Sequence, residues 1–386
     1  MRRNESNQTN NNQTGCTHCH KLKKKKIKKL QIKKIKYFKR NGGKFIIALF
    51  IVEKHDILLF LYLLCVMSGS SRIIIAGGSG AIGKTLRKVF SREGLSKVHE
   101  SLEFTVITRS KKNRIDSEAL SFLTWEEIEK EGLPDCKSLI NLTGANIMES
   151  KWTKSGPVYS SRIDTTRTLC EAMKKNPPLS FVSASAVGIY ETNTEKELDE
   201  KSQLLPYEKM NFPQQLVYDW EQEAKKAPSS VKTTLVRVGF VVGPDQNGIK
   251  AMTLPLGIIG IGKMGSGKQP FPWIHEEDLC EMMFHAALDP NSTGGIINGV
   301  APQIITQEQF SIVFNRAIGT RFNIPVPGAL LKLIGEKSTL LLEGPRVIPK
   351  EVSNVIPSFQ YKFKTIHSAM NDIEQKIQGI AKQTSN

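Results

Sequence analysis

The sequence has few cysteines and no uninterrupted apolar run long enough to cross a membrane. Six cysteines occur in 386 residues, and the three in the body of the chain, Cys136, Cys170 and Cys280, are widely separated. This usage is typical of a reducing compartment and excludes a disulfide framework. Residues 45–67 are apolar, but the polar stretch 53–56 divides them into two short runs, 45–52 and 57–67. A bilayer span needs about 20 residues, so we expect neither a membrane-spanning protein nor a membrane partner.

The body of the chain also lacks a strong net charge. Residues 1–66 carry 16 Lys and Arg against 3 Asp and Glu, which is +13 of the total of +17. The other residues carry 38 against 34, which is only +4. The basic balance therefore belongs to the N-terminal segment, and we expect no nucleic-acid partner for the folded body.

Residues 1–66 are expected to be a disordered basic leader followed by the interrupted apolar segment. The lysine-rich stretch 21–40 is compatible with a nuclear address, an anchor on anionic lipid or a solvated arm. Met67 is a natural start directly before the first expected strand, so 1–66 are interpreted as an upstream extension that the fold does not need. We expect a cytoplasmic protein, with a nuclear location as the alternative.

Residues 73–83 carry the most informative pattern in the chain. A β-branched run at 73–76 predicts a buried parallel strand, and it leads directly into the glycine-rich loop 77–83 and an expected helix at 84–91. Such a loop binds the pyrophosphate of a dinucleotide on the free amides at the helix start; the alternative is a glycine-rich turn without a ligand. The glycines permit the tight turn, the close approach of the phosphates and the packing of the helix. We predict cofactor contacts from Gly77, Gly80, Ala81, Ile82 and Gly83.

The second expected strand, 104–108, ends at a basic residue. An NAD-binding enzyme would place Asp or Glu there against the ribose hydroxyls. This chain has Arg109, followed by Lys111 and Lys112. A guanidinium can hold a 2′-phosphate that an acid would repel, so NADPH is favoured over NADH. Thr108 and Arg109 are the predicted contacts; the alternative is that Arg109 only faces solvent.

Further strands are expected at 138–142, 179–185 and 234–239, alternating with helical stretches. This alternation predicts an α/β fold with a doubly wound parallel sheet of the Rossmann type. Turns at the carboxyl ends of such strands lie beside the cofactor. Additional candidates for cofactor contacts are Leu142, Thr143, Arg162 and Val241. For Arg162 a surface ion pair is equally compatible with the sequence.

Several ordered motifs carry a family resemblance over about 72–380. The glycine loop, the segment Asn141-Leu142-Thr143-Gly144 and the strand end with Ser185 and Tyr190 resemble the extended short-chain dehydrogenase/reductase superfamily. More specific are Trp220-Glu221, GSGKQ at 265–269, PWIHEEDL at 272–279, NGVAP at 298–302 and LEGPRVIPK at 342–350. Together they resemble the atypical branch called the epimerase family protein, short-chain dehydrogenase/reductase family 39U, with its C-terminal domain of unknown function.

The resemblance implies the fold, NADP(H) as the cofactor and a division into two regions. The Rossmann domain is expected at 67–243 with 273–302, and a smaller interleaved substrate region at 244–272 with 303–386. It implies no particular reaction, substrate or oligomeric state, and we expect no metal site.

The chain departs from the superfamily at its catalytic pair. Catalytic members use a Tyr with a Lys four residues later, and the Lys lowers the phenol pKa so that it can exchange a proton near neutrality. None of the seven tyrosines has a Lys at that spacing. Aligning on Trp220-Glu221 places the two positions near Pro213 and Val217, which cannot transfer protons. Ser185 and Tyr190 remain as candidate catalytic residues; the alternatives are a hydroxyl bonded within its own turn and a packing phenol.

His275 and Asp278 would also suit a catalytic pair, but a structural role is favoured. In that interpretation Asp278 caps a helix at 279–288.

Two functions remain open: an NADP(H)-dependent oxidoreductase or epimerase acting on a small carbonyl or sugar-like substrate, and a non-catalytic NADPH-binding regulatory protein. The missing Tyr–Lys pair favours the second, and a retained substrate region favours the first.

Overall fold

The computed structural model describes residues 72–384, apart from 92–101, 113, 115, 118, 149–150, 193, 245–258 and 321. The chain divides into two compact units, Met1–Gly69 and Ser70–Asn386, and all described residues belong to the second. The predictions for residues 1–66 lie outside the described residues.

A seven-stranded parallel sheet forms the centre of the second unit. Its strands are β1 (Arg72–Ala76), β2 (Glu103–Thr108), β3 (Leu120–Thr124), β4 (Ser138–Asn141), β5 (Ser180–Ala186), β6 (Lys232–Val238) and β10 (Gly295–Gly299). They lie in the order β10-β6-β5-β4-β1-β2-β3. Ile73 of β1 is in register with Phe104 of β2 on one side and with Ser138 of β4 on the other. The chain therefore reverses its direction of winding at β1, and ligands of such sheets bind beyond the strand ends at this point.

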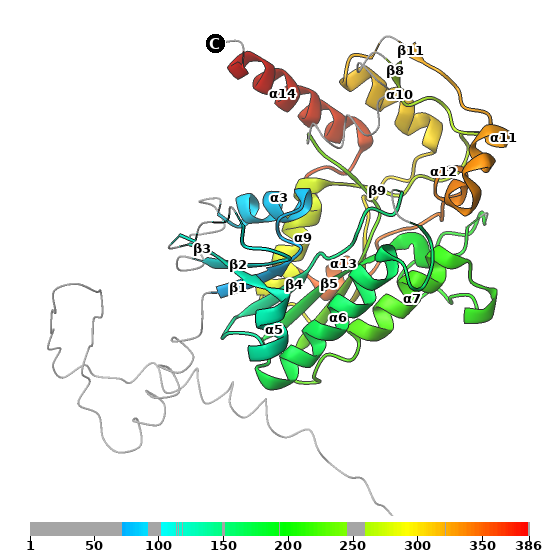
Figure 1. The fold of residues 1–386 in the computed structure, drawn as a ribbon. Helices are drawn as coiled ribbons and strands as arrows, with labels where there is room; N and C mark the ends of the chain where they lie inside the picture. Colours follow the sequence, from blue (N-terminus) through cyan, green and yellow to red (C-terminus); the bar gives the residue numbers. More distant parts are fainter. Residues whose placement is uncertain are drawn as a thin grey trace, which may run out of the picture. The chain divides into compact units, whose positions relative to one another are not determined.

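Helices cover both faces of the sheet (Figure 1). On one face lie α3 (Ala81–Phe90) and α9 (Glu276–Leu288); on the other lie α5 (Trp125–Glu131), α6 (Pro157–Lys175) and α7 (Phe212–Ala224). Each face has its own apolar core, the first around Ile73, Leu86 and Met282 and the second around Ile74 and Leu169. Successive residues of β1 alternate between the two cores, as the period of a strand requires. The predicted doubly wound α/β fold is confirmed.

Smaller elements lie beyond the carboxyl ends of the strands (Figure 1). Two short parallel pairs occur there, β7 (Phe240–Val242) with β9 (Trp273–His275) and β8 (Ile259–Gly260) with β11 (Phe322–Asn323). The helical elements are α10 (Gln307–Ala317), α11 (Gly328–Leu331), η4 (Lys332–Ser338), α12 (Thr339–Leu342) and α14 (Ile366–Thr384). A third core joins α10 and α14 through residues that include Phe310, Phe314, Ile366 and Met370.

Shorter helical turns complete the fold. Two of them, η2 (Val187–Ile189) and η3 (Tyr207–Lys209), lie between β5 and α7. After α12 the chain returns to the sheet, where α13 (Val352–Val355) and the residues behind it pack into the core shared by β10 and α9. The segment 303–386 therefore contributes to two cores, one beyond the strand ends and one against the sheet. None of the helices in the described part of the chain is long and apolar enough to cross a bilayer.

The prediction that Asp278 caps a helix is wrong. Helix α9 begins at Glu276, and its N-cap is His275, whose Nδ1 accepts a hydrogen bond of 3.1 Å from the amide of Glu277. Asp278 lies in the first turn and accepts backbone hydrogen bonds of 2.9 Å from Lys362 and Phe363. The sequence showed an acid near a helix start, but the helix begins before the expected residue and the acid anchors the chain ahead of α14 instead.

Candidate functional site

A cavity of about 970 Å³ opens at the carboxyl ends of β1, β4, β5 and β6. Its lining combines the loop before α3, the turn after β4, the end of β5, one side of α7, and residues of α12 and the segment after it. The structure therefore brings together segments that are far apart in the sequence, from residue 77 to residue 345. Nine of the predicted site residues line it: Gly77, Gly80, Ala81, Ile82, Gly83, Leu142, Thr143, Arg162 and Ser185.

The three glycines of the loop have distinct geometric roles. Gly77 has a φ of +76°, and a Cβ on it would lie 2.7 Å from the carbonyl oxygen of Leu142. A Cβ on Gly83 would lie 2.4 Å from the Cα of Gly78, so only glycine lets α3 pack this closely on the loop. Gly80 is different, because a Cβ there would meet only the carbonyl oxygen of Gly77, at 3.4 Å. Its bare backbone faces the cavity.

The positive end of the helix dipole of α3 is not compensated by any side chain of its first turn. Gly80 is the N-cap, no side chain caps the helix, and no acidic residue lies in its first turn. By contrast, α5, α7 and α10 each begin with a capping box, in which the N-cap side chain accepts a hydrogen bond from the amide of the third helical residue and the side chain of that residue accepts one from the N-cap amide. The amides of the first turn of α3 and the helix dipole are therefore available to an anion at the cavity.

The turn after β4 is held by a buried asparagine. The Oδ1 of Asn141 accepts hydrogen bonds from the amide of Thr143, at 3.1 Å, and from its hydroxyl, at 2.7 Å. The Nδ2 of Asn141 donates to the hydroxyl of Thr166 on α6, at 2.8 Å. This network fixes Leu142 and Thr143 at the cavity wall, directly beside the glycine loop.

Arg162 is a half-buried cation of α6 at the cavity wall. Its Nη1 donates to the carbonyl oxygens of Ala145, at 3.2 Å, and Val158, at 2.9 Å, and its guanidinium lies 5.4 Å from the ring centre of Trp220. Burial lowers its pKa to about 10, so the side chain stays protonated at neutral pH. The geometry is that of a cation held beside the cavity, and the alternative of a surface ion pair does not describe these contacts.

Ser185 belongs to a buried polar network that the sequence did not indicate. Its hydroxyl donates to Oε1 of Glu221, at 2.7 Å. Glu221 receives two further bonds from Arg237, of 2.7 and 2.9 Å, in a bidentate pair. Arg237 also donates to the hydroxyl of Tyr190, at 2.8 Å, which in turn donates to Oδ1 of Asn298, at 2.9 Å. All five side chains are buried.

This network determines what the two candidate catalytic residues can do. The proton of Ser185 points at a carboxylate of α7, so the hydroxyl is bonded neither within its own turn nor into the cavity. Toward a ligand it offers lone pairs. Tyr190 does not line the cavity, and burial raises its pKa above the usual value of 10. A phenol in this position stays protonated near neutrality.

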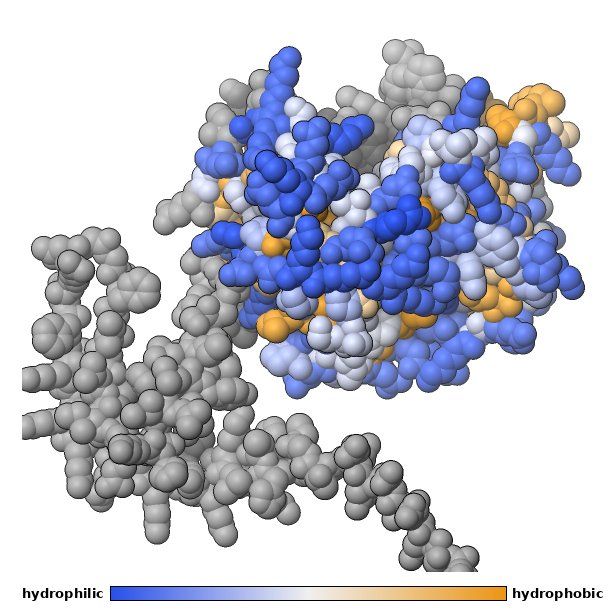
Figure 2. Space-filling model, turned by 60° about the horizontal axis from the view of Figure 1, so that its bottom comes forward, coloured by the Kyte–Doolittle hydropathy of each residue, from blue (hydrophilic) through white to orange (hydrophobic). Residues whose placement is uncertain are grey.

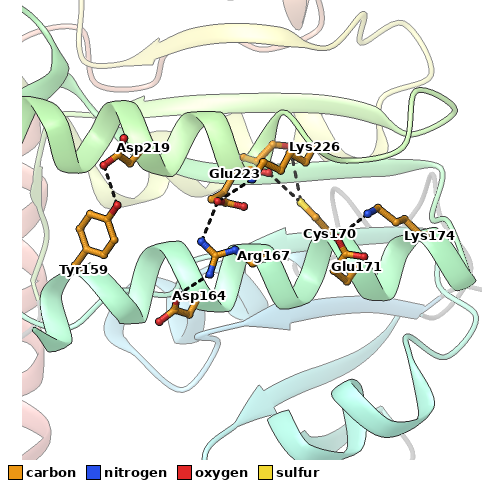
Figure 3. Close-up of polar contacts among 10 residues, drawn as sticks. Tyr159, Asp164, Arg167, Cys170, Glu171, Lys174, Asp219, Glu223 and Lys226 are labelled. Carbon is orange, nitrogen blue, oxygen red and sulfur yellow. Dashed lines mark hydrogen bonds and ion pairs between the residues drawn. The ribbon is translucent and has the colours of Figure 1, made fainter. Parts of the chain in front are cut away.

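Pro213 and Val217, the residues at the two positions of the missing catalytic pair, both line the cavity. They lie four residues apart on α7, one turn after another on the same side. Polar contacts between the facing sides of α6 and α7 hold the two helices together (Figure 3). These include a bond of 2.8 Å from Tyr159 to Asp219 and an ion pair of 3.0 Å between Arg167 and Glu223. The wall that would carry a Tyr–Lys pair is thus firmly positioned and apolar.

Four predicted residues lie outside the lining: Thr108, Arg109, Tyr190 and Val241. Thr108 is buried and donates to the carbonyl oxygen of Ser110, at 3.1 Å. Arg109 is exposed directly after β2. Val241 lies in β7 and packs against the core that α3 and α9 share.

Sequence reasoning missed two groups of residues. Arg237 is a single charge in the otherwise apolar stretch 235–242, and this signal could have indicated a buried ion pair; Glu221 lies among other charged residues and gives no such signal. The second group is an apolar wall formed by Ile147, Met148, Phe240, Phe271, Leu340 and Leu341. No local signal identifies this wall, because its members come from separate segments between positions 147 and 341 of the sequence.

Comparison with known proteins identifies the family. Residues 73–298 match the model of the NAD dependent epimerase/dehydratase family. The chain is 33% identical over 310 residues to the human epimerase family protein SDR39U1, covering 78% of this chain and 99% of the human one. Its fold is similar to the crystal structure of human SDR39U1 with NADPH, with a TM-score of 0.68, 32% identity and coverage of 79% and 99%.

The fold is also similar to that of more distant relatives. One is the UDP-N-acetylglucosamine 4-epimerase of Bacillus cereus, with a TM-score of 0.60, 14% identity and coverage of 80% and 99%. The match of the family model to most of the described unit, together with the identity to the human relative along most of the chain, agrees with the motifs and the sheet order. This chain belongs to the NAD-dependent epimerase/dehydratase family of extended short-chain dehydrogenases/reductases.

Proposed function

We propose that the chain binds NADPH in the cavity and acts as an NADP(H)-dependent oxidoreductase or epimerase on a small carbonyl compound. The observation that carries the proposal is the uncapped first turn of α3 at the cavity, where the bare backbone of Gly80 leaves room for a phosphate. Backbone amides at a helix start are suited to bind a pyrophosphate. The human relative, whose structure was solved with NADPH, supports the choice of cofactor.

The residues of the chain fit such a cofactor at each of its parts. The amides of Ala81 and Ile82 would hold the pyrophosphate, and Leu142 and Thr143 would contact a ribose. Arg109, exposed after β2, would bind the 2′-phosphate. When bound, such a cofactor supplies a hydride that converts a carbonyl group and a proton into an alcohol.

Ser185 would position the alcohol form of the substrate without donating its own proton. Its hydroxyl proton goes to Glu221, so its lone pairs accept a hydrogen bond from a hydroxyl or amide group in the cavity. Glu221 and Arg237 keep the serine in this orientation.

A second candidate function is a non-catalytic NADPH-binding protein. It is favoured by one specific observation, which is that Pro213 and Val217 occupy the cavity wall where a proton-transferring pair would stand. Stopped-flow oxidation of bound NADPH by a panel of ketones and aldehydes separates the two functions. Oxidation by any of them supports the enzyme, and tight NADPH binding without oxidation supports the regulatory protein.

Cofactor binding is tested by calorimetry on a glycine variant with a matched control. Gly80→Ala leaves the packing of the loop intact, since its Cβ meets only one atom at 3.4 Å, but fills the space of the pyrophosphate. We expect NADPH affinity to fall by about tenfold or more, in line with about 1–3 kcal/mol for overfilling a packed site. Gly379→Ala on α14, where nothing lies within 4 Å, serves as the control and should bind NADPH normally. Equal affinity of Gly80→Ala and wild type would exclude this site.

The choice of NADPH over NADH is tested with Arg109→Ala. A charge-assisted contact to the 2′-phosphate contributes about 1.5–3 kcal/mol, so the variant should lose most of the preference while NADH affinity stays constant. An unchanged preference would show that other residues recognise the 2′-phosphate. A cytoplasmic location is also proposed, because Cys136 and Cys170 are free thiols, as is usual in a reducing compartment.

A further inference from the structure

The cavity has a second chemical character away from the glycine loop. Helix α12 lies across the strand ends from α3 (Figure 1). Around it the lining consists of apolar side chains from four separate segments: Ile147, Met148, Phe240, Phe271, Leu340 and Leu341. Pockets of this kind take their binding energy from the apolar surface that the ligand covers.

Three of these side chains are unusually exposed for their size. Met148 is 39 % exposed, and Phe240 and Leu340 are each 38 % exposed, although all three line the cavity. The ring of Phe240 packs against two other aromatic rings in series. Its centre lies 4.9 Å from that of Phe271, and the ring of Phe271 stacks on that of Phe310 with 4.3 Å between their centres. The exposed apolar surface is therefore a rigid wall.

Polar tethers hold this wall in place before any ligand binds. The side chain of Gln269 donates to the carbonyl oxygen of Leu341, at 2.8 Å. Lys337 donates to the carbonyl oxygen of Met148, at 2.7 Å, and Thr192 donates to Glu343, at 2.6 Å. Because the apolar wall is already ordered, ligand binding there costs little conformational entropy.

The charges of the lining oppose an anionic ligand at this end. Glu343 places a carboxylate in the wall beside the apolar side chains. Within the described lining, Arg162 is the one Lys or Arg; it lies against Gly144, and its Nη1 is directed to backbone carbonyls. A nucleoside diphosphate needs Arg or Lys partners for its phosphates, and the carboxylate of Glu343 would repel it.

We propose that the substrate is an uncharged, hydrophobic carbonyl compound, held against Met148, Phe240 and Leu340, and not a nucleoside diphosphate sugar. The inference rests on the proposed function, because the same cavity must hold NADPH at the glycine loop. It adds the class of molecule that occupies the remaining space.

The apolar surface continues outside the cavity along α11 and η4. Leu330, Leu333 and Ile334 are 57, 79 and 45 % exposed, and none of them lines the cavity. Figure 2 shows hydrophobic surface gathered at the right-hand edge of a mainly hydrophilic face, the side on which α11 and α12 lie in Figure 1. Leu333 thus provides a matched control for Leu340: the same residue type in the neighbouring helical element η4, but outside the lining.

The test uses the full chain saturated with NADPH and two ligands. One is prodan, an uncharged hydrophobic naphthyl ketone whose fluorescence moves to shorter wavelength in apolar surroundings, and the other is UDP-glucose. We expect prodan to bind with a blue-shifted emission and UDP-glucose not to displace it. Leu340→Asp should weaken prodan binding by about tenfold or more, because it places a charge in the apolar wall. Leu333→Asp should change it by less than about twofold.

NADPH affinity, measured by calorimetry on the same samples, separates the two proposals. Failure of the wild-type protein to bind NADPH would overturn the proposed function itself. Normal NADPH binding together with displacement of prodan by UDP-glucose would overturn the substrate class alone. Equal weakening by Leu340→Asp and Leu333→Asp would do the same, because it would place prodan on the outer surface.

Discussion

At the scale of single residues, the protein concentrates its buried polar chemistry in one network. Ser185, Glu221, Arg237, Tyr190 and Asn298 connect the end of β5 to α7, β6 and β10. A buried carboxylate is tolerable here because a bidentate guanidinium neutralises it and hydrogen bonds satisfy the remaining atoms. The network joins the cavity wall at Ser185 to Asn298 in β10, the strand at one edge of the sheet.

Tyr190 tests whether this network serves stability or chemistry. Tyr190→Phe removes the hydroxyl between Arg237 and Asn298 and leaves two buried polar groups without that partner. We expect the free energy of unfolding in urea to fall by about 1–3 kcal/mol, with NADPH affinity unchanged because Tyr190 lies outside the lining.

The matched control for this change is Tyr218→Phe on α7. The Tyr218 hydroxyl has no hydrogen-bond partner within the described part of the chain, so stability should change by less than about 0.5 kcal/mol. An unaltered stability of Tyr190→Phe, or a loss of NADPH affinity, would contradict a structural role for the phenol.

At the scale of elements, the starts of helices α3 and α9 show opposite solutions to the same problem. Helix α3 leaves its first amides uncapped at the cavity, whereas α9 is capped by the fully buried imidazole of His275. Burial lowers the pKa of His275 to about 4. Asp372, Lys376, Glu277 and Lys362 surround it, and its Nε2 lies 3.2 Å from Oδ2 of Asp372 without hydrogen-bond geometry.

The cap makes stability depend on pH in a defined direction. The folded-state pKa of His275 lies below the unfolded value of 6.5, so between these values the unfolded chain binds the proton and the folded chain does not. The contribution of His275 is therefore fully present above pH 6.5 and is lost as the pH falls toward about 4.

His275→Asn tests this dependence, because asparagine can cap a helix and does not titrate. In urea unfolding series between about pH 4.5 and 6.5, the slope of stability against pH should be smaller in the variant by up to about 1.4 kcal/mol per pH unit. The variant is also expected to be less stable above pH 6.5, because it leaves the space beside Phe363 partly empty. Identical slopes would mean that His275 does not titrate in this range.

At the scale of the whole described unit, the sheet and the elements beyond its ends enclose the cavity together. The glycine loop and the turn after β4 form one side, and residues 339–345 form part of the other. The bonds from Thr192 to Glu343 and from Lys337 to Met148 tether the segment 337–343 to two earlier segments of the chain. Cavity shape thus depends on contacts between segments that are distant in the sequence.

Thr192→Val should loosen this wall without altering the cofactor end. The lost hydrogen bond to a carboxylate contributes about 1 kcal/mol at a partly exposed position. We therefore expect amide hydrogen exchange at 339–345 to become about fivefold faster, with normal exchange at 77–86. Thr194→Val in the same loop, whose hydroxyl accepts only a local bond from the Lys196 amide, is the control. Unchanged exchange at 339–345 would show that the tether does not restrain the wall.

The helix start at α9 and the serine of β5 show where prediction from the sequence reached its limit. The order of strand, glycine turn and helix was predicted correctly for 73–90, because each step depends on neighbours close by in the chain, although α3 begins at Ala81 and not at the expected residue 84. Asp278 was assigned the wrong partner, since the amides that it binds belong to Lys362 and Phe363, far along the chain. The partner of Ser185, Glu221, lies on another element and was missed for the same reason.

The sequence by itself determined the doubly wound sheet, the glycine loop and the absence of a Tyr–Lys pair, because these follow from local periodicity, steric requirements of glycine and residue identity. Only the tertiary structure decided that Ser185 gives its proton to Glu221 and that His275 caps α9. It also decided that apolar side chains from positions 147 to 341 form one wall of the cavity. Those contacts depend on how distant segments pack, and no short stretch of sequence specifies the packing of the others.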